Sequence, residues 1–420
     1  MVEGILFEQV EDSRQDWKVK HSISEILMVV MCGVSAGERS IYGIREFARL
    51  KEQWLRDVIG LKLPNGLPSY DTVRRVLGML DPKQFQSVFI GWIEEELDIP
   101  VGSYVSLDGK TLRGSGLKEA GIDPLHLLHA YSHELGVVIG QMECSSEKTN
   151  EIPIAERLIQ ILKIKGVIIT ADALLCQKEI VKKIAKDNDY ILALKGNHPL
   201  MEQEVKDFFL SPAPSTRSVH TTFDKGHGRI ERRIYTLDTN IGWFEDKKEW
   251  KHLAAFGMVE SIVTRKGKEC REIRYFITSV TDVKQFAKGV RSHWAIENNL
   301  HWCLDVLFSD DACTVLDRNA AENLAIIRRI VYNRIKMLSK MDTLSMGKRA
   351  CIYAFFDKCQ KFSSKMFSNR YKVASSCFRF LYTVSRPAIA LINIQRIICI
   401  HSLYIFYLKR EQLPNAAAGF

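Results

Sequence analysis

Three acidic residues far apart in the chain lie at positions where carboxylates could share a catalytic task. Asp108 follows the apolar run Ser103–Leu107, and Asp172 follows a second run at residues 166–171. Glu297 lies in a segment whose apolar residues recur at helical spacing, so it flanks a stripe that faces a core. Hard divalent cations prefer oxygen ligands, and a pair of them can activate water and stabilise a leaving oxygen. The three acids are therefore candidate ligands of a metal-dependent active site.

The residues before Asp108 are predicted to form a short strand that ends at this acid. The run is bounded by Pro100 and Gly109, as strands often are. Gly109 would let the backbone turn away at once, so that the carboxylate projects from the edge of the strand. Asp-Gly is also common in ordinary turns, and this dipeptide alone favours that simpler interpretation.

Five motifs follow one another along most of the chain. They are Ser-Leu-Asp108-Gly-Lys, Ile-Thr-Ala-Asp172-Ala, Ala-Leu-Lys195-Gly-Asn-His198, Gly-His227-Gly-Arg229-Ile-Glu-Arg232-Arg and His293-Trp-Ala-Ile-Glu297-Asn-Asn-Leu-His-Trp-Cys-Leu-Asp305. Together they resemble the DDE transposases of the H-repeat-associated family, which is linked to bacterial insertion sequences, and their order is far more specific than any one motif.

The resemblance implies an α/β fold: an RNase H-like catalytic core with a mostly β insertion, preceded by an N-terminal helical domain. It also implies that Asp108, Asp172 and Glu297 bind Mg²⁺ or Mn²⁺, as two ions. In this interpretation Asp108 bridges both ions, and each of the other two acids completes one coordination shell. The reaction would be metal-dependent cleavage and transfer of DNA strands at the ends of an insertion sequence. Three structural acids with no shared task are the alternative.

Six further residues are candidates for contacts with DNA: Lys110, Lys195, His198, Arg229, Arg232 and His293. Arginine forks match phosphate oxygens, and His227 precedes the two arginines in the same motif. An ordinary solvated cation is an equal alternative at these positions, because sequence does not distinguish the two. Related transposases with a β insertion often carry Tyr, Arg and Lys around the catalytic glutamate, whereas this chain has His293 there.

Other residues near these motifs have simpler interpretations. Trp294 and Trp302 are expected to pack, with stacking on an unpaired base as the less frequent alternative. Nearby acids could act as outer-shell groups or be solvated; these are Asp305, Asp310 and Asp311. A zinc site is not favoured at the three histidines that straddle a strand and a turn, which are His126, His129 and His133.

The pattern changes at residue 103 from helices to short strands. Residues 125–131 and 137–142 predict a hairpin around Gly136, and a helix, a strand, a helix and a strand follow. Strand–helix–strand units of this length imply parallel pairing, which would place the two aspartates on neighbouring central strands. Alternating segments predict antiparallel strands in the insertion, at 229–237, 254–265 and 270–278.

We divide the chain into five predicted parts. They are a helical N-terminal domain with possible DNA binding (1–100), the first part of the core (101–210), the β-rich insertion (211–285), core helices with the catalytic glutamate (286–350) and a divergent basic tail (351–420). Serines predict helix starts in the first part, at Ser22 or Ser24, Ser40 and Ser69. Arg74 and Arg75 there are consistent with a helix-turn-helix, but also with a plain helical bundle.

Positive charge is concentrated at the C-terminal end. The net charge is +9, and the residues from 317 onward hold 18 Lys and Arg against 5 Asp and Glu. A helix is predicted at 320–338, with Arg328, Arg329, Arg334 and Lys336 displayed around an apolar face. Such charge suggests a nucleic-acid partner. Resemblance to the family ends near Ala350, so part of this charge could be accidental.

The sequence also bears on where the protein works. Early acids, among them Glu3 and Glu8, do not fit a signal peptide, and the ten cysteines show no paired metal-ligand spacing. The apolar stretch at 388–408 is interrupted by polar residues, so a membrane span is not expected. A cytoplasmic protein that associates with the nucleoid when bound to DNA is the prediction.

The leading hypothesis is a transposase that acts on double-stranded DNA at the terminal inverted repeats of its element, as a homo-oligomer. The second is a catalytically inactive or domesticated DNA-binding remnant, which the divergent tail would favour and the intact acid triad would not. A stand-alone nuclease on the same core is a third, and strand-joining activity would separate it from a transposase.

Overall fold

The computed structural model describes residues 6–144, 151–212, 217–226, 228–265 and 267–337. All of them belong to one compact unit, Met1–Phe355. The tail predicted at 351–420 and His227 lie outside the described residues. Within these ranges no helix is both long and apolar enough to cross a membrane.

Helices make up the N-terminal region, as the sequence predicted. The main ones are α2 (Ile23–Ser35), α3 (Ile41–Leu50), α5 (Tyr70–Met79) and α6 (Pro82–Glu96), with the short α4 (Glu52–Trp54) and a π-helical turn (Leu55–Ile59) after α3. Each of the main helices follows a residue whose side-chain oxygen accepts a hydrogen bond from an N–H of the first turn. These capping residues are Ser22, Ser40, Ser69 and Asp81.

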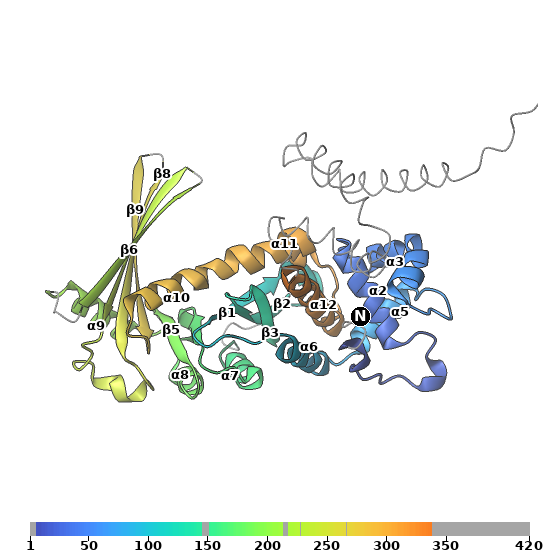
Figure 1. Ribbon diagram of the computed structural model, residues 1–420, viewed down its shortest axis with the longest axis horizontal. Helices are drawn as coiled ribbons and strands as arrows, with labels where there is room; N and C mark the ends of the chain where they lie inside the picture. Colours follow the sequence, from blue (N-terminus) through green and yellow to red (C-terminus); the bar gives the residue numbers. More distant parts are fainter. Residues whose placement is uncertain (1–5, 145–150, 213–216, 227, 266, 338–420) are drawn as a thin grey trace, which may run out of the picture. The chain divides into compact units, whose positions relative to one another are not determined.

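A nine-stranded sheet follows, in the order β3-β2-β1-β4-β5-β9-β8-β7-β6 (Figure 1). Its first five strands are β1 (Tyr104–Leu112), β2 (Leu125–Ser132), β3 (Val137–Cys144), β4 (Ile168–Ala171) and β5 (Asp189–Leu194). β2 pairs antiparallel with β1 and β3, whereas β1, β4 and β5 run parallel. This is the arrangement expected of an RNase H-like core, and it confirms that the two aspartates follow or lie on neighbouring strands.

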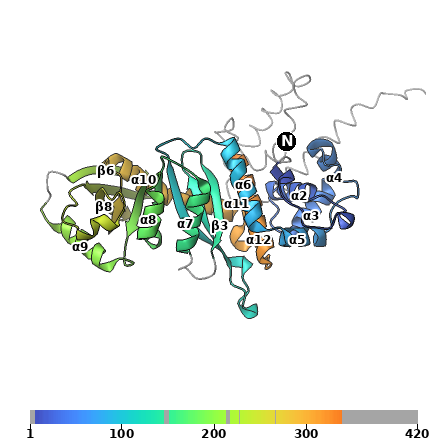
Figure 2. The ribbon, with the colours of Figure 1, turned by 90° about the horizontal axis from the view of Figure 1, so that it is seen from below.

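Helices cover both faces of the sheet. α10 (Val283–Ile296) crosses one face, and α7 (Glu151–Leu162) and α8 (Lys178–Ile184) lie against the other (Figure 1). The second view shows α6 and α7 beside β3 (Figure 2). Because side chains alternate along a strand, Tyr104 packs with Phe286 of α10, while Leu107 belongs to the core on the other face. The even-numbered residues of β1 therefore face α10.

The predicted end of the first strand at Asp108 is wrong. β1 continues through Gly109 to Leu112, because β2 pairs with it from Val105 up to the pair Leu112–Leu125. Gly109 is needed for close approach rather than for a turn. A Cβ atom at this position would lie 2.8 Å from Nε2 of His126 and 3.1 Å from Oε1 of Glu151.

The predicted insertion contains four strands, and they extend the core sheet. They are β6 (Arg217–Gly226), β7 (Arg229–Asp238), β8 (Ala255–Arg265) and β9 (Lys268–Thr278), and α9 (Pro199–Leu210) leads into them. β9 pairs antiparallel with β5, which joins the two parts. The sequence predicted the last three strands. β6 was not predicted from the sequence. Its residues are half-buried or exposed along its whole length, so it has no buried apolar face and no alternation of apolar and polar residues to indicate a strand.

The C-terminal helices of the described region are α11 (Trp302–Phe308) and α12 (Arg318–Met337). α12 packs against α2, α5 and α6 and also against β3, so it joins the N-terminal helices to the sheet. The expectation that Arg328 and Arg329 are displayed on its surface is wrong, because their exposed fractions are 1% and 0%. Both form ion pairs with buried Asp310, at 3.0 Å and 2.7 Å.

Candidate active site

The pairing of β1 with β4 places Asp108 beside Asp172. The last residues paired between the two strands are Leu107 and Ala171, so each aspartate directly follows the last paired residue of its strand. Asp172 then starts a short helical turn, where its Oδ1 accepts hydrogen bonds from the N–H groups of Leu174 and Leu175 at 3.1 Å and 3.4 Å. The sheet thus brings together two acids that are 64 positions apart in the sequence.

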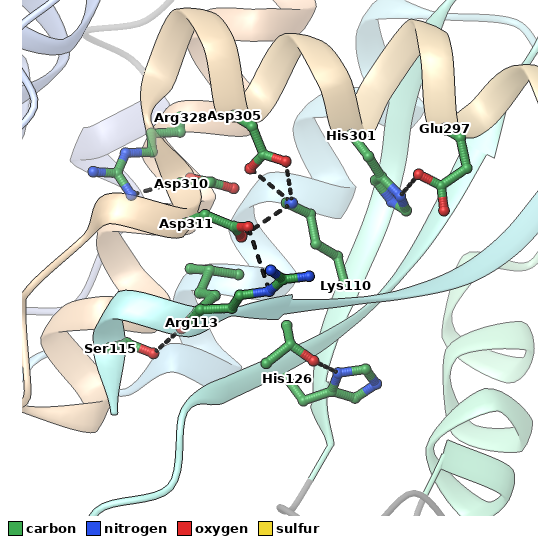
Figure 3. A network of polar contacts seen from close by, with 12 residues as sticks. Lys110, Arg113, Ser115, His126, Glu297, His301, Asp305, Asp310, Asp311 and Arg328 are labelled. Carbon is green, nitrogen blue, oxygen red and sulfur yellow. Dashed lines mark hydrogen bonds and ion pairs between the residues drawn. The ribbon is translucent and has the colours of Figure 1, made fainter. Parts of the chain in front are cut away.

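Glu297 reaches the same place from the helix that crosses this face. It begins a π-helical turn, Glu297–His301, inserted between α10 and α11. Such insertions are rare and occur frequently at functional sites. Oxygens of Asp108 and Glu297 and a nitrogen of His301 all lie within 4.8 Å of one another. Figure 3 shows the side chains of Glu297 and His301 directed toward each other on this helix. His301 Nδ1 is 3.5 Å from Asp108 Oδ2 and 3.4 Å from Glu297 Oε2.

The pKa values of Asp108 and Glu297 are shifted in opposite directions. Burial raises the pKa of Asp108 to about 6; His301 opposes the shift, and the charges of Glu297 and Asp172 add to it. The pKa of Glu297 is lowered, chiefly by its hydrogen bond with His301, and its side chain is exposed. A cation bound beside Asp108 would stabilise the ionised form of this carboxylate and offset its repulsion from the other two acids.

Lys110 lies two residues beyond Asp108 on the same face of β1, and its side chain is buried. Its Nζ is 2.7 Å from a carboxylate oxygen of Asp305 on α11 and 3.3 Å from Oδ1 of Asp311 (Figure 3). Arg113 Nε also approaches Asp311, at 3.8 Å. Asp305 and Asp311, which the sequence left open as outer-shell or solvated acids, therefore form ion pairs with the side chains of Lys110 and Arg113 next to the candidate site.

A chain of hydrogen-bonding side chains lies directly behind the three acids. Ser106 Oγ is 2.6 Å from Nε2 of His133 and 2.7 Å from Oγ1 of Thr170, which is 3.3 Å from Nδ1 of His293. Ser106 and Thr170 precede Asp108 and Asp172 by two strand positions, and His293 precedes Glu297 by about one helical turn. The chain therefore fastens together the three elements that carry the acids. Burial lowers the pKa of His133 and of His293 to about 4, so both rings are neutral near pH 7.

Thr170→Val is expected to weaken this linkage with little change in shape. Loss of one buried and one partly buried hydrogen bond should lower the free energy of unfolding by about 1–3 kcal/mol. The rate of the metal-dependent DNA cleavage predicted from the sequence should fall by roughly tenfold, because displacement of the acids costs more than stability alone. Urea unfolding and cleavage rates below the unfolding transition would be measured on both proteins. The matched control is Thr111→Val, whose hydroxyl contacts His126 at 2.8 Å on the opposite face of β1; equal losses of activity in the two variants would contradict the assigned role.

The remaining candidates for DNA contact lie in two places. Lys195 is exposed after β5, and His198 donates from Nε2 to the carbonyl oxygen of Cys176 at 2.7 Å, close to the turn that follows Asp172. Arg229 and Arg232 are exposed on β7, and the guanidinium of Arg232 lies 5.7 Å from the ring centre of Phe223. Lys195 and His198 thus lie after β5, close to the turn that follows Asp172. Arg229 and Arg232 lie on β7, in the part of the sheet that the insertion adds.

Several side chains differ from what the sequence suggested. Trp294 and Trp302, expected to pack, are 46% and 57% exposed, and Arg274 lies 4.4 Å from the ring centre of Trp294. The three histidines considered for zinc face different partners, which are Glu151 for His126, Arg329 for His129 and Ser106 for His133. His301 was not among the residues predicted for the site, although its separation of four residues from Glu297 on a helix was a usable signal.

Two family models match most of this chain. The family model described as Transposase DDE domain matches residues 100–334, and the one described as DDE_Tnp_1-associated matches residues 5–93. Putative transposase YncI of Escherichia coli O157:H7 is 36% identical over 335 residues, which cover 78% of this chain and 85% of the relative.

A second relative and one solved structure are also similar. H repeat-associated putative transposase YhhI of Escherichia coli (strain K12) is 34% identical over 335 residues, covering 77% of this chain and 87% of the relative. The similarity to the structure of the piggyBac transposase synaptic complex with hairpin DNA covers 89% of this chain and 84% of that one, at 11% identity and a TM-score of 0.39. The family matches and the two relatives establish that this chain belongs to the DDE transposases, in the H-repeat-associated group.

Proposed function

We propose that this transposase cleaves and joins DNA strands at the ends of its insertion sequence with divalent cations bound by Asp108, Asp172 and Glu297. The observation that carries the proposal is the convergence of these acids from β1, β4 and the π-helical turn, with the pKa of Asp108 raised to about 6. Oxygen donors crowded in this way fit Mg²⁺ or Mn²⁺. Two ions are proposed, because a pair can serve both the attacking and the leaving oxygen.

The protein's own groups would bind and orient these reactants. The charges of both other acids act on Asp108, so it is suited to bridge the ions, while Asp172 and Glu297 would each complete one shell. Bound ions would neutralise charge at the phosphate and activate as nucleophile a solvent water or the 3′ hydroxyl of the DNA. Lys110, fixed by Asp305, would keep positive charge near the scissile phosphate and hold α11 against β1.

Double-stranded DNA at terminal inverted repeats is the proposed partner. Lys195, Arg229 and Arg232 are exposed and would contact phosphates. His198 and His293 would contribute hydrogen bonds to the DNA. His293 would do so as a neutral ring, because its pKa is lowered to about 4. Assembly as a homo-oligomer on DNA, and work in the cytoplasm with nucleoid association when bound, belong to the same proposal. The inactive or domesticated remnant has no better support.

The test is cleavage of labelled DNA that carries the element's end, with Mg²⁺ or Mn²⁺, by the full-length chain and two variants. Glu297→Gln and Asp172→Asn are expected to bind this DNA and fail to cut it. Glu179→Gln is a matched control, because Glu179 is also a helical glutamate with an exposed side chain. Cleavage by the wild type without added metal, or full cleavage by either variant, would refute the assignment. Binding without cleavage by the wild type would favour the inactive remnant.

Lys195→Gln is expected to weaken DNA binding about equally for specific and unrelated sequences, because phosphate contacts carry no sequence information. The slope of log K against log salt concentration should decrease in magnitude by about 0.9, the value for one lost phosphate contact. Lys206→Gln on α9 is the control, since Lys206 is likewise an exposed lysine but lies within the helix. Fluorescence anisotropy at several salt concentrations would measure both slopes, and identical slopes in the two variants would contradict the contact.

A further inference from the structure

We propose that His301 is a nitrogen ligand of the metal site and makes that site favour Mn²⁺ and Co²⁺ over Mg²⁺. The inference rests on the proposed function, because it concerns an ion held by Asp108 and Glu297. It adds a donor of a different chemical class to the three acids. It also assigns a task to a buried histidine that the acid triad does not require.

The geometry of the ring supports ligation. Nδ1 of His301 lies 3.5 Å from Asp108 Oδ2 and 3.4 Å from Glu297 Oε2. Donor atoms about 2.1 Å from one ion and at right angles to each other are about 3 Å apart, so small movements would bring all three to a common ion. Asp172, the remaining acid, follows β4 next to Asp108 and would approach from the adjacent strand.

The surroundings of His301 hold the ring in this place. The residue is 4% exposed, and its ring centre is 5.6 Å from that of His129. His129 is itself fixed, because its Nε2 accepts a hydrogen bond from Nη2 of Arg329 at 3.0 Å. The π-helical turn ends at His301 and places both this ring and the carboxylate of Glu297 beside Asp108 of β1. A side chain so confined cannot swing into solvent, and its Nδ1 stays directed at the two carboxylates.

Ligand chemistry turns this placement into selectivity. Mg²⁺ takes oxygen ligands almost exclusively and tolerates little departure from octahedral geometry. First-row transition ions accept imidazole, with affinities that rise from Mn²⁺ to Co²⁺. His301→Gln should therefore lower Mn²⁺ affinity by about tenfold or more while changing Mg²⁺ affinity much less. His301→Asp should move the preference toward Mg²⁺, because it restores an oxygen donor at the same position.

The experiment uses Mn²⁺ alone with the full-length protein and needs no cleavage assay. Electron paramagnetic resonance gives the fraction of bound Mn²⁺ in a titration, and its pulsed form detects a coordinated imidazole nitrogen directly. Labelling the histidines with ¹⁵N separates their signal from backbone nitrogen. Wild type, His301→Gln, Asp108→Asn and the control His220→Gln would be compared, since His220 lies on β6 outside the site.

The outcomes separate this inference from the proposal on which it rests. A histidine nitrogen coupling that is present in the wild type and in His220→Gln but lost in His301→Gln supports ligation. Mn²⁺ binding that depends on Asp108 but shows no histidine coupling in the wild type overturns the role of His301 and leaves the acid site intact. A coupling that persists in His301→Gln also overturns it. Absence of any Asp108-dependent Mn²⁺ binding overturns both proposals.

Discussion

Asp108→Asn is expected to stabilise the metal-free protein at neutral pH and at the same time to abolish DNA cleavage. Burial and neighbouring acids raise the pKa of this carboxyl from 3.8 to about 6. The unfolded chain therefore releases the proton more readily than the folded one. The stability contributed by the protonated carboxyl is fully present below about pH 4 and is lost as the pH rises through about 6.

The size of the effect follows from the shift. Ionised Asp108 should cost on the order of 3 kcal/mol at pH 8, because each unit of pKa corresponds to about 1.4 kcal/mol. Asparagine cannot ionise, so the gain from the substitution should be large at pH 8 and small at pH 4. Cleavage should fall by about 10²–10³ or more, the scale for loss of one group that stabilises charge in a transition state.

Urea unfolding without metal, at pH 4 and pH 8, measures the stability part. Mn²⁺ should then stabilise the wild type at pH 8 but not the variant, because binding to the folded state alone raises its stability. Asp71→Asn is the control, since Asp71 is on α5 and its side chain is 72% exposed. A pH dependence of stability that is unchanged by Asp108→Asn would show that this carboxyl does not carry the shifted pKa.

Asp310→Ala is expected to cause the largest loss of stability among single substitutions at ion pairs of the described region. Asp310 is fully buried and is the acid paired with both Arg328 and Arg329. Its removal leaves two buried guanidinium groups without that charge, which typically costs 3–5 kcal/mol. His129 cannot compensate, because burial and the charge of Arg329 hold its pKa well below the ordinary value and the ring stays neutral.

The consequence should extend to the N-terminal helices. Arg328 also donates to the carbonyl oxygen of Arg39 at 3.3 Å, and Asn323 on the same helix donates to Leu77 and Leu80. Loosening of α12 should therefore expose the region before β1 to proteolysis. Circular dichroism during chemical unfolding and limited proteolysis would measure the two effects.

The neighbouring Asp311→Ala is the matched control for this substitution. Asp311 is about one-third exposed, and its partner Lys110 retains Asp305. Its loss should cost about 1 kcal/mol or less, as for other partly exposed pairs. Similar losses of stability in the two variants would mean that the buried position of Asp310 does not matter.

Local features of this protein were readable from the sequence. Serine caps mark the starts of three N-terminal helices, because a side chain that satisfies a free N–H acts within four residues. The hairpin around Gly136 has a positive φ of 70° at that glycine. The alternation of strands and helices from residue 103 onward predicted the parallel core and with it the proximity of Asp108 and Asp172.

The tertiary structure decided what depends on partners distant in the chain. Gly109 looked like a turn, but β2 extends β1 beyond it and leaves no room for a side chain. Arg328 looked like a surface cation, yet Asp310 draws it into the interior. Burial, pairing and the π-helical turn that aims His301 at the acids arise from packing between segments that the sequence separates. Residue type and spacing therefore determined which groups could do chemistry, and only the packed fold determined which of them meet.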